Sequence, residues 1–295
     1  MKYDGKGILL ILTATLCFAA IPAMVITAHA GGMDVLTLLS IRYLLASVIL
    51  VPWALFRVKR NLPPIRVMGN IMLVAGIFLA LEAGLYFTSL TLLPSSVAVL
   101  LLFTFPLMVN ILGLFSGHRI SPRGWLSVLL CLIGLTALLG PGLGQLNLPG
   151  IVFALLAAVS YSIYMVRIDK LAADVNPVVT NALVSLANAL TMTVAAVATG
   201  TLRLAFAPSA WIAIFLMVAV SNVMGFLLFF HALKRLGPER TAMLNLTEPL
   251  FTVLIALLFL QEKFSMVQAA GAMVMVLGLF LFMRFSQKLA VQPED

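Results

Sequence analysis

The sequence places an acidic residue directly before a proline, Glu248-Pro249, near the middle of the apolar segment 237–265. A carboxylate at bilayer depth costs on the order of 2.5–3.5 kcal/mol on insertion scales. Pro249 has no N–H, so a continuous helix would lose its bond to the carbonyl of Asn245 and would be strained there. Such defects persist only where protein or a water-filled cavity surrounds them. The segment therefore predicts a helix that lines a path through a membrane.

The chemistry available to Glu248 follows from its depth. It lies about 12 Å from the end of the segment at Arg240, and no basic residue shares that level. A carboxyl group in a low dielectric favours its neutral form and can hold a proton or a cationic group. The alternative is a neutral acid that caps the carbonyl of Asn245. Glu248 and Asn245 are both candidate site residues.

Two further charges lie inside apolar segments. Arg42 lies about 10 Å and Glu82 about 9 Å from the same edge of their segments, at 1.5 Å of helix per residue. Their matching depths predict an ion pair. Two interpretations of that pair remain open, a structural link between two helices and a group that binds substrate.

A polar stripe follows one face of the segment 177–198. Asn181, Ser185, Asn188 and Thr191 recur at helical spacing. Ser185 lies 143 residues after Arg42, so the two helices are expected to offer polar groups to one interior. Hydrogen bonding between helices explains the stripe equally well. Ser185 and Asn188 join the candidate set.

Aromatic residues are the last candidates. Most aromatic side chains in membrane spans serve packing or anchor the span at the interface. Tyr86 and Tyr161 fall on faces that also carry polar residues, so we expect them in the wall of a cavity, together with Phe103. A substrate with an apolar body and charged ends would suit this mixture.

The composition fixes the class of protein that must position these groups. Of the 295 residues, 63% are hydrophobic and 9% are charged, whereas soluble domains average roughly 25% charged residues. The chain is therefore an integral membrane protein whose environment is the lipid bilayer. The net charge of +8 is spread over short loops, with no basic face that predicts a nucleic-acid partner. Cys17 and Cys131 fall inside apolar segments and are expected to be buried.

Apolar stretches of about 20 residues predict ten transmembrane helices in an all-α fold. We expect the first to be retained, although Ala28-His29-Ala30 resembles a signal cleavage site. The predicted spans are residues 7–28, 35–56, 67–88, 95–115, 124–140, 150–166, 177–198, 209–231, 240–260 and 265–284.

The basic residues test this map independently. If the spans alternate, fifteen of the eighteen Lys and Arg residues fall on one side. By the positive-inside rule, that side is cytoplasmic and both termini lie there. The fifteen are Lys2, Lys6, Arg57, Lys59, Arg60, Arg66, Arg119, Arg123, Arg167, Lys170, Lys234, Arg235, Arg240, Arg284 and Lys288.

The two halves of the sequence repeat. Residues Pro94, Ala98, Phe115, Ser121 and Gly134 each find the same residue type 144 positions later, and Pro106 answers Pro249 with an offset of 143. The offset covers five spans, an odd number, so the second five must enter the membrane from the opposite side. This predicts two inverted five-helix repeats, residues 1–143 and 144–295, around a central cavity. Paired broken helices at Pro106 and Pro249 are a pointer to a transporter's binding region.

At this point the sequence resembles a known family. Arg42-Tyr43 with Ala46, Pro106, the run from Glu248-Pro249-Leu250 to Glu262, and the glycines Gly271 and Gly278 look like the EamA-type drug/metabolite transporters. The resemblance implies a ten-helix secondary transporter in a bacterial inner membrane, often an exporter of amino acids or related metabolites. The first half departs from the pattern, because Phe105 stands where Glu248 stands and 116–119 replaces the Leu-x-Glu ending.

The sequence bears on three classes of function: a transporter, an intramembrane enzyme and a non-transporting membrane scaffold. A secondary-active or facilitative transporter of small metabolites, working by alternating access with or without proton coupling, accounts for the charges within spans. Its runner-up is an exporter of cationic drug-like or quaternary amine compounds. An intramembrane enzyme would need a metal motif or a nucleophile with its base, and the sequence shows neither. The sequence also contains no phosphate-binding loop, so we do not expect ATP hydrolysis by this chain. A non-transporting scaffold would need neither the buried charges nor the broken helices. We expect no cofactor and no metal.

Overall fold

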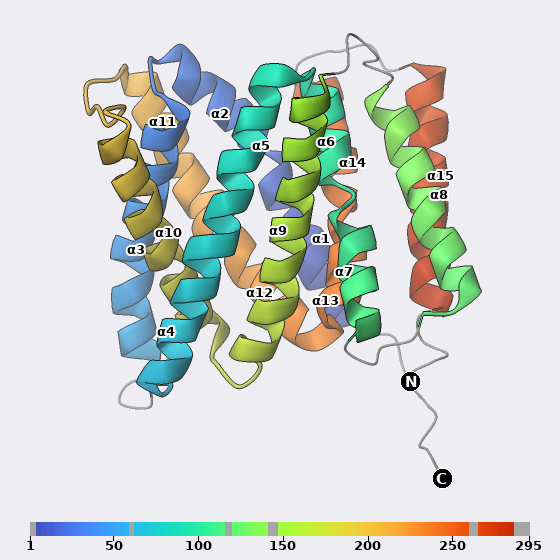
Figure 1. Cartoon of the computed structure of the whole chain (residues 1–295), viewed down its shortest axis with the longest axis horizontal. Coiled ribbons are helices and arrows are strands. Elements are labelled where there is room, and N and C mark those ends of the chain that lie inside the picture. The colour runs from blue at the N-terminus through green and yellow to red at the C-terminus, as the bar shows by residue number, and fades with distance from the viewer. Residues whose placement is uncertain (1–3, 59–61, 116–119, 141–146, 260–264, 286–295) are drawn as a thin grey trace. The chain divides into compact units, whose positions relative to one another are not determined.

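The structure, a computed structural model, describes residues 4–58, 62–115, 120–140, 147–259 and 265–285. Every regular element within these ranges is a helix (Figure 1), which confirms the predicted all-helical class. Some residues used in the sequence argument lie outside the described ranges. They are Lys2, Lys59, Arg60, 116–119, Glu262, Lys263 and Lys288.

The helices follow the predicted spans closely, and several spans are built from more than one helix. Nine helical segments within the described residues are long and apolar enough to cross a membrane. The predicted ninth span consists of two shorter helices, α13 and α14. The elements are α1 (Gly5–Ala19), α2 (Ile21–Ala30), α3 (Val35–Val58), α4 (Ile65–Val74), η1 (Ala75–Leu79), α5 (Ala80–Leu92), α6 (Ser95–Leu102), α7 (Phe105–Phe115), α8 (Pro122–Leu139), α9 (Leu148–Ala172), α10 (Pro177–Ala198), α11 (Pro208–Met217), η2 (Val218–Gly225), α12 (Phe226–Leu236), α13 (Pro238–Asn245), α14 (Thr247–Phe259) and α15 (Met266–Phe285).

The helices form two compact units. Unit 1 contains residues 1–5, 81–166 and 236–295, and unit 2 contains residues 6–80 and 167–235. Each unit therefore takes helices from both halves of the chain, so the units differ from the predicted halves 1–143 and 144–295.

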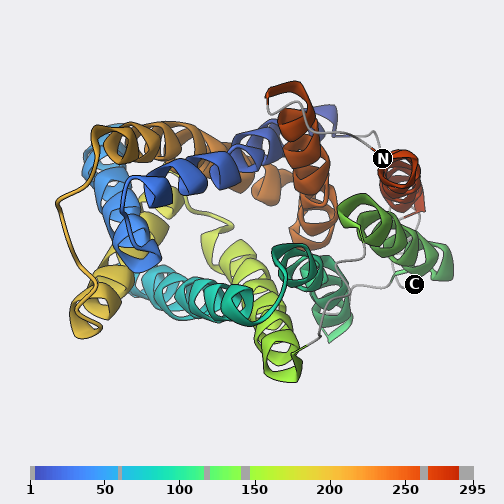
Figure 2. The ribbon, with the colours of Figure 1, turned by 90° about the horizontal axis from the view of Figure 1, so that it is seen from above.

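In unit 1, α8 and α15 pack together along their length (Figures 1 and 2). A Cβ atom added to Gly134 would come within 2.5 Å of the Met275 nitrogen, and one added to Gly278 would come within 2.7 Å of the Cys131 sulfur. Later residues of α8 meet earlier residues of α15, so the two helices are antiparallel. The small residues let the two backbones approach closely. The two contacts are related by the sequence repeat, because Gly278 lies 144 residues after Gly134 and Met275 lies 144 residues after Cys131.

In unit 2, α3 and α10 form the corresponding pair. The Thr37 hydroxyl, near the beginning of α3, donates to the carbonyl of Thr201, just after α10, over 2.8 Å. At the other end of the pair, Val58 and Val179 line the same cavity. This pair is therefore also antiparallel. Arg42 on α3 and Ser185 on α10 are the positions that the sequence offset of 143 relates.

The proline breaks differ from the prediction in detail. The chain leaves the helix at Leu246, and Pro249 lies in the first turn of α14. Pro106 likewise lies in the first turn of α7. The first N–H groups of a helix have no partner within it, so a proline there costs little. The predicted strain at Pro249 was therefore wrong, because a new helix begins just before the proline.

Two segments wind as π-helices at matching positions of the two halves. Shifting η1 (Ala75–Leu79) by 144 residues places it within η2 (Val218–Gly225). π-Helices are rare, and they are found frequently at functional sites. η2 carries the polar pair Ser221-Asn222 in an otherwise apolar span.

Two glycines of the third span, Gly76 and Gly84, differ in how closely other helices approach them. A Cβ atom added to Gly76 would approach the Thr191 hydroxyl on α10 to 3.1 Å, which confirms close packing there. Nothing lies within 4 Å of the same position at Gly84.

Candidate functional site

A buried polar cluster in unit 2 holds Arg42. Its Nε donates to the side-chain oxygen of Asn222 over 2.5 Å, and Nη2 donates to the Ser221 hydroxyl over 3.1 Å. Arg42 is 6% exposed, and both partners are fully buried. Hydrogen bonds to a charged group contribute more than those between neutral groups. The cluster therefore keeps a guanidinium group solvated by protein inside an apolar bundle.

The π-helix positions the partner of Arg42. In η2, hydrogen bonds that run from i to i+5 disturb the regular α-helical ladder. The backbone carbonyl of Asn222 accepts a hydrogen bond from the Asn181 amide on α10 over 2.9 Å. Asn222 thus contacts α3 through its side chain and α10 through its backbone. One residue ties together three helices that are far apart in sequence.

Three buried amide atoms of unit 2 have no protein partner. They are Nδ2 of Asn222 and the Oδ1 atoms of Asn181 and Asn188. All three residues are fully buried. An unsatisfied buried polar atom costs about 1–3 kcal/mol, and such atoms usually bond an internal water or a ligand. Asn222 and Asn181, which are joined by a hydrogen bond, thus offer one donor and one acceptor to a small polar partner.

A second cluster, in unit 1, contains acidic groups. The carboxyl groups of Glu82 on α5 and Glu248 on α14 lie close enough to act on each other electrostatically, and both act on the Tyr86 hydroxyl. Both acids and Tyr86 are partly buried. The structure thus brings together three residues that the sequence singled out separately. Two like charges in a low dielectric repel strongly, so the cluster favours binding a proton or a cation.

The break between α13 and α14 lies next to this acidic cluster in the chain. Asn245 ends α13 and is 4% exposed, and its Oδ1 has no hydrogen-bond partner. Thr247 begins α14, and its hydroxyl donates a hydrogen bond of 2.7 Å to the carbonyl of Leu244. The broken helix therefore places a carboxyl group and an amide oxygen within one turn of each other. Both groups accept hydrogen bonds.

Aromatic rings line the corresponding break between α6 and α7. Phe105 meets Tyr161 edge to face with centroids 4.8 Å apart, and Tyr161 stacks on Tyr164 at 5.9 Å. Phe103 lies 5.9 Å from Phe105. The Ser162 hydroxyl on α9 has two acceptors for its one hydrogen, the Ala158 carbonyl in its own helix at 2.6 Å and the Phe105 carbonyl at 3.1 Å. These contacts place Phe103 and Tyr161 in one row of rings.

The remaining candidates are placed as follows. Ser185 and Asn188 lie on the buried face of α10 at 2% and 0% exposure. The Asn188 amide donates to the carbonyl of Val184 in its own helix, whereas Asn181 bonds across to η2. The interhelical alternative therefore holds for Asn181. Arg42 belongs to unit 2 and Glu82 to unit 1, and the ion pair between them stays a prediction.

The sequence argument missed Ser221 and Asn222. The sequence signal for them is that two polar residues stand side by side in the middle of the apolar span 209–231. Arg42 uses an uncharged amide as a partner, and a search for opposite charges does not find such a residue. Among the described residues, no group of three or more His, Cys, Asp or Glu residues could hold a metal ion.

Comparison with known proteins identifies the family. The EamA-like transporter family model matches twice, over residues 5–140 and 148–284. The chain belongs to the EamA-like transporter family. Together with the apolar helices, this membership makes the chain a multi-pass membrane protein of a transporter family.

One curated protein and one solved structure resemble the chain over most of its length. The chain is 27% identical over 284 residues to the uncharacterized transporter YcbK of Bacillus subtilis (strain 168), covering 92% of this chain and 90% of the relative. A solved crystal structure has the same fold, with a TM-score of 0.81 and 22% identity over 97% of this chain and 99% of the other. The likeness in fold therefore extends over nearly the whole chain.

Proposed function

We propose that the protein is a secondary-active or facilitative transporter of small metabolites that works by alternating access. The observation that carries the proposal is the acidic cluster of Glu82, Tyr86 and Glu248 beside a broken helix in unit 1. Intramembrane acids that face protein or water mark ion and substrate paths. Discontinuous helices supply the polar backbone groups that such a path needs.

The inverted arrangement of two five-helix halves is part of this proposal. It is supported by two antiparallel helix pairs, α8 with α15 and α3 with α10, whose members are related by about 144 residues. Two matches of one family model point the same way. Inverted repeats give a transporter two similar conformations that open to opposite sides. We place both termini in the cytoplasm of a bacterial cell because most basic residues fall on that side.

The substrate proposal rests on the acidic cluster of unit 1. The two carboxyl groups of that cluster suit an ammonium group. The family resemblance adds amino acids and related metabolites, moved outward. A second candidate, cationic drug-like or quaternary amine compounds, is favoured by the row of rings at Phe105, Tyr161 and Tyr164, because aromatic faces attract cations.

Flux into reconstituted vesicles tests the role of Glu248. We expect Glu248→Gln to reduce substrate flux and to abolish any response of flux to an imposed pH gradient. Glu239→Gln, an acid at the beginning of α13 outside the acidic cluster, is the matched control and should keep both. Flux by Glu248→Gln that equals the wild-type flux would remove Glu248 from the mechanism.

Ligand-induced stabilisation separates the two substrate classes. A compound that binds only the folded protein raises its unfolding temperature. The proposal expects stabilisation by amino acids that carry both charges, and the runner-up expects it from quaternary amines. Repeating the titration with Glu248→Gln shows whether the stabilising compound uses the acidic cluster.

A further inference from the structure

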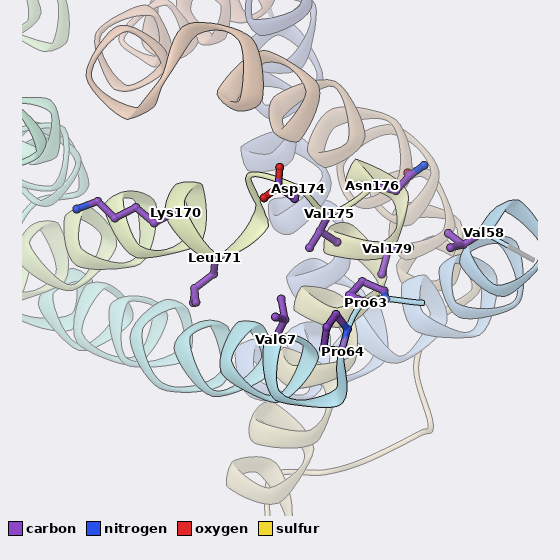
Figure 3. A pocket seen from close by; sticks show the side chains of 10 residues that line it. All are labelled: Val58, Pro63, Pro64, Val67, Lys170, Leu171, Asp174, Val175, Asn176 and Val179. Atoms are coloured by element: carbon purple, nitrogen blue, oxygen red, sulfur yellow. The ribbon is translucent and has the colours of Figure 1, made fainter. Parts of the chain in front are cut away.

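A cavity of about 570 Å³ opens in unit 2 (Figure 3), and no residue of the Arg42 cluster lines it. It lies where α3 ends, α4 begins, α9 ends and α10 begins. Its volume falls within the range of about 300–1,000 Å³ that small-ligand sites occupy. Neither the family assignment nor the proposed transport mechanism uses it. The lining residues are Val58, Pro63, Pro64, Val67, Lys170, Leu171, Asp174, Val175, Asn176 and Val179.

The lining divides into an apolar wall and a charged rim. Figure 3 shows Val67, Leu171 and Val175 facing a common space, with the carboxylate of Asp174 and the ammonium of Lys170 further out. Both charged residues are exposed, as is Asn176. A lysine whose stem lies along an apolar wall can keep its ammonium in water. The lining therefore combines one ammonium group, one carboxylate and an apolar surface.

The position of the cavity matches the headgroup layer of a bilayer. All four surrounding helices belong to candidate membrane spans, and the cavity lies at their ends. Phe56 and Ile65, close in sequence to Val58 and Pro64, are 82% and 81% exposed. Exposed apolar side chains on a membrane span face acyl chains. Exposed apolar side chains therefore stand two residues before Val58 and one residue after Pro64, which line the cavity.

We propose that this cavity binds the headgroup of a phospholipid that carries both a phosphate and a primary ammonium group. The phosphate pairs with Lys170, the ammonium donates to Asp174, and the glycerol and upper acyl chain lie against Val67, Leu171 and Val175. Basic pockets between membrane helices are known recognition sites for lipid headgroups. Asp174 is the carboxylate of this lining, and it selects a headgroup that adds a donor to its phosphate.

Lipids with the same acyl chains and different headgroups test the proposal on the full-length protein in detergent micelles. Phosphatidylethanolamine has phosphate and N–H donors, phosphatidylcholine has phosphate without N–H donors, and phosphatidylglycerol has no ammonium. We expect phosphatidylethanolamine to raise the unfolding temperature most and to remain bound most strongly in native mass spectrometry. Free phosphoethanolamine should stabilise far less, because it lacks the apolar part that the wall binds.

Two exposed-residue variants assign the contacts without disturbing the core. Asp174→Asn should erase the preference for phosphatidylethanolamine over phosphatidylcholine. Lys170→Gln should weaken the binding of every phospholipid by about tenfold or more, the loss expected for one charge-assisted hydrogen bond. Lys234→Gln, an exposed lysine that does not line this cavity, is the matched control and should bind like wild type.

Three results would overturn the proposal. Equal stabilisation by the three lipids would show that no headgroup is selected. A preference that survives Asp174→Asn would remove the carboxylate from the site. Protection of Leu171→Cys against a thiol reagent by a water-soluble metabolite, with no protection by phospholipid, would assign the cavity to a transported solute instead.

Discussion

The guanidinium of Arg42 and the side-chain amide of Asn222, 180 residues apart in the sequence, form a 2.5 Å hydrogen bond inside unit 2. The bond joins the second and eighth apolar spans. The amide oxygen of Asn222 is uncharged, so this bond solvates the guanidinium group without cancelling its positive charge. The π-helix that carries Asn222 is therefore part of the support for Arg42 and a first target for mutation.

Replacing Asn222 by leucine keeps the volume and removes the acceptor. We expect Asn222→Leu to lower the free energy of unfolding by about 1.5–3 kcal/mol, the value of a hydrogen bond to a charged group. Denaturation in detergent micelles measures it. Ser47→Ala on α3 removes a bond of 2.7 Å to the Tyr43 carbonyl within one helix and should cost less. Equal losses for the two variants would contradict the importance of the Arg42–Asn222 bond.

The contact between α8 and α15 predicts the cost of adding a methyl group. A Cβ atom at Gly134 would lie 2.5 Å from the Met275 nitrogen, closer than real contacts allow. Gly134→Ala and Gly278→Ala should each destabilise the protein by about 1–3 kcal/mol through overpacking. Gly84→Ala, where nothing lies within 4 Å, should be neutral or stabilising, because alanine favours helix more than glycine does. The unfolding temperatures of the three variants check this ranking.

The position of Pro249 in the first turn of α14 separates stability from transport. Pro249→Ala should change the free energy of unfolding by about 1 kcal/mol or less, because a proline is compatible with that turn. It also permits α13 and α14 to join, so we expect substrate flux to fall. A loss of about 3 kcal/mol or more would show that the proline holds the fold itself.

Glu248→Gln should be more stable than the wild type while it transports less. A carboxamide needs less solvation than a carboxylate and no longer repels Glu82. Substitutions that relieve an unfavourable functional site often add about 0.5–2 kcal/mol. Thermal unfolding and flux, measured on one preparation, test the pair of effects. A variant that loses both stability and flux would indicate a structural role for Glu248.

Local features of the sequence predicted the helices well, and pairing was harder to predict. Hydropathy is a property of each segment, so the spans, the acids within them and the breaks near Pro106 and Pro249 could be read directly. The break itself was misplaced, because the sequence could not show that a new helix would begin at Thr247. That choice depends on the first-turn geometry, which accepts a proline without strain.

The sequence by itself determined a membrane protein with two related halves and a short set of intramembrane polar groups. Only the tertiary structure decided which of these groups meet. It placed Arg42 with Asn222 and Ser221, and Glu248 with Glu82 and Tyr86. The physical reason is that the hydropathy of each segment decides whether that segment enters the bilayer, so the sequence shows it directly. A buried donor meets its acceptor only when helices that are far apart in the sequence pack against each other.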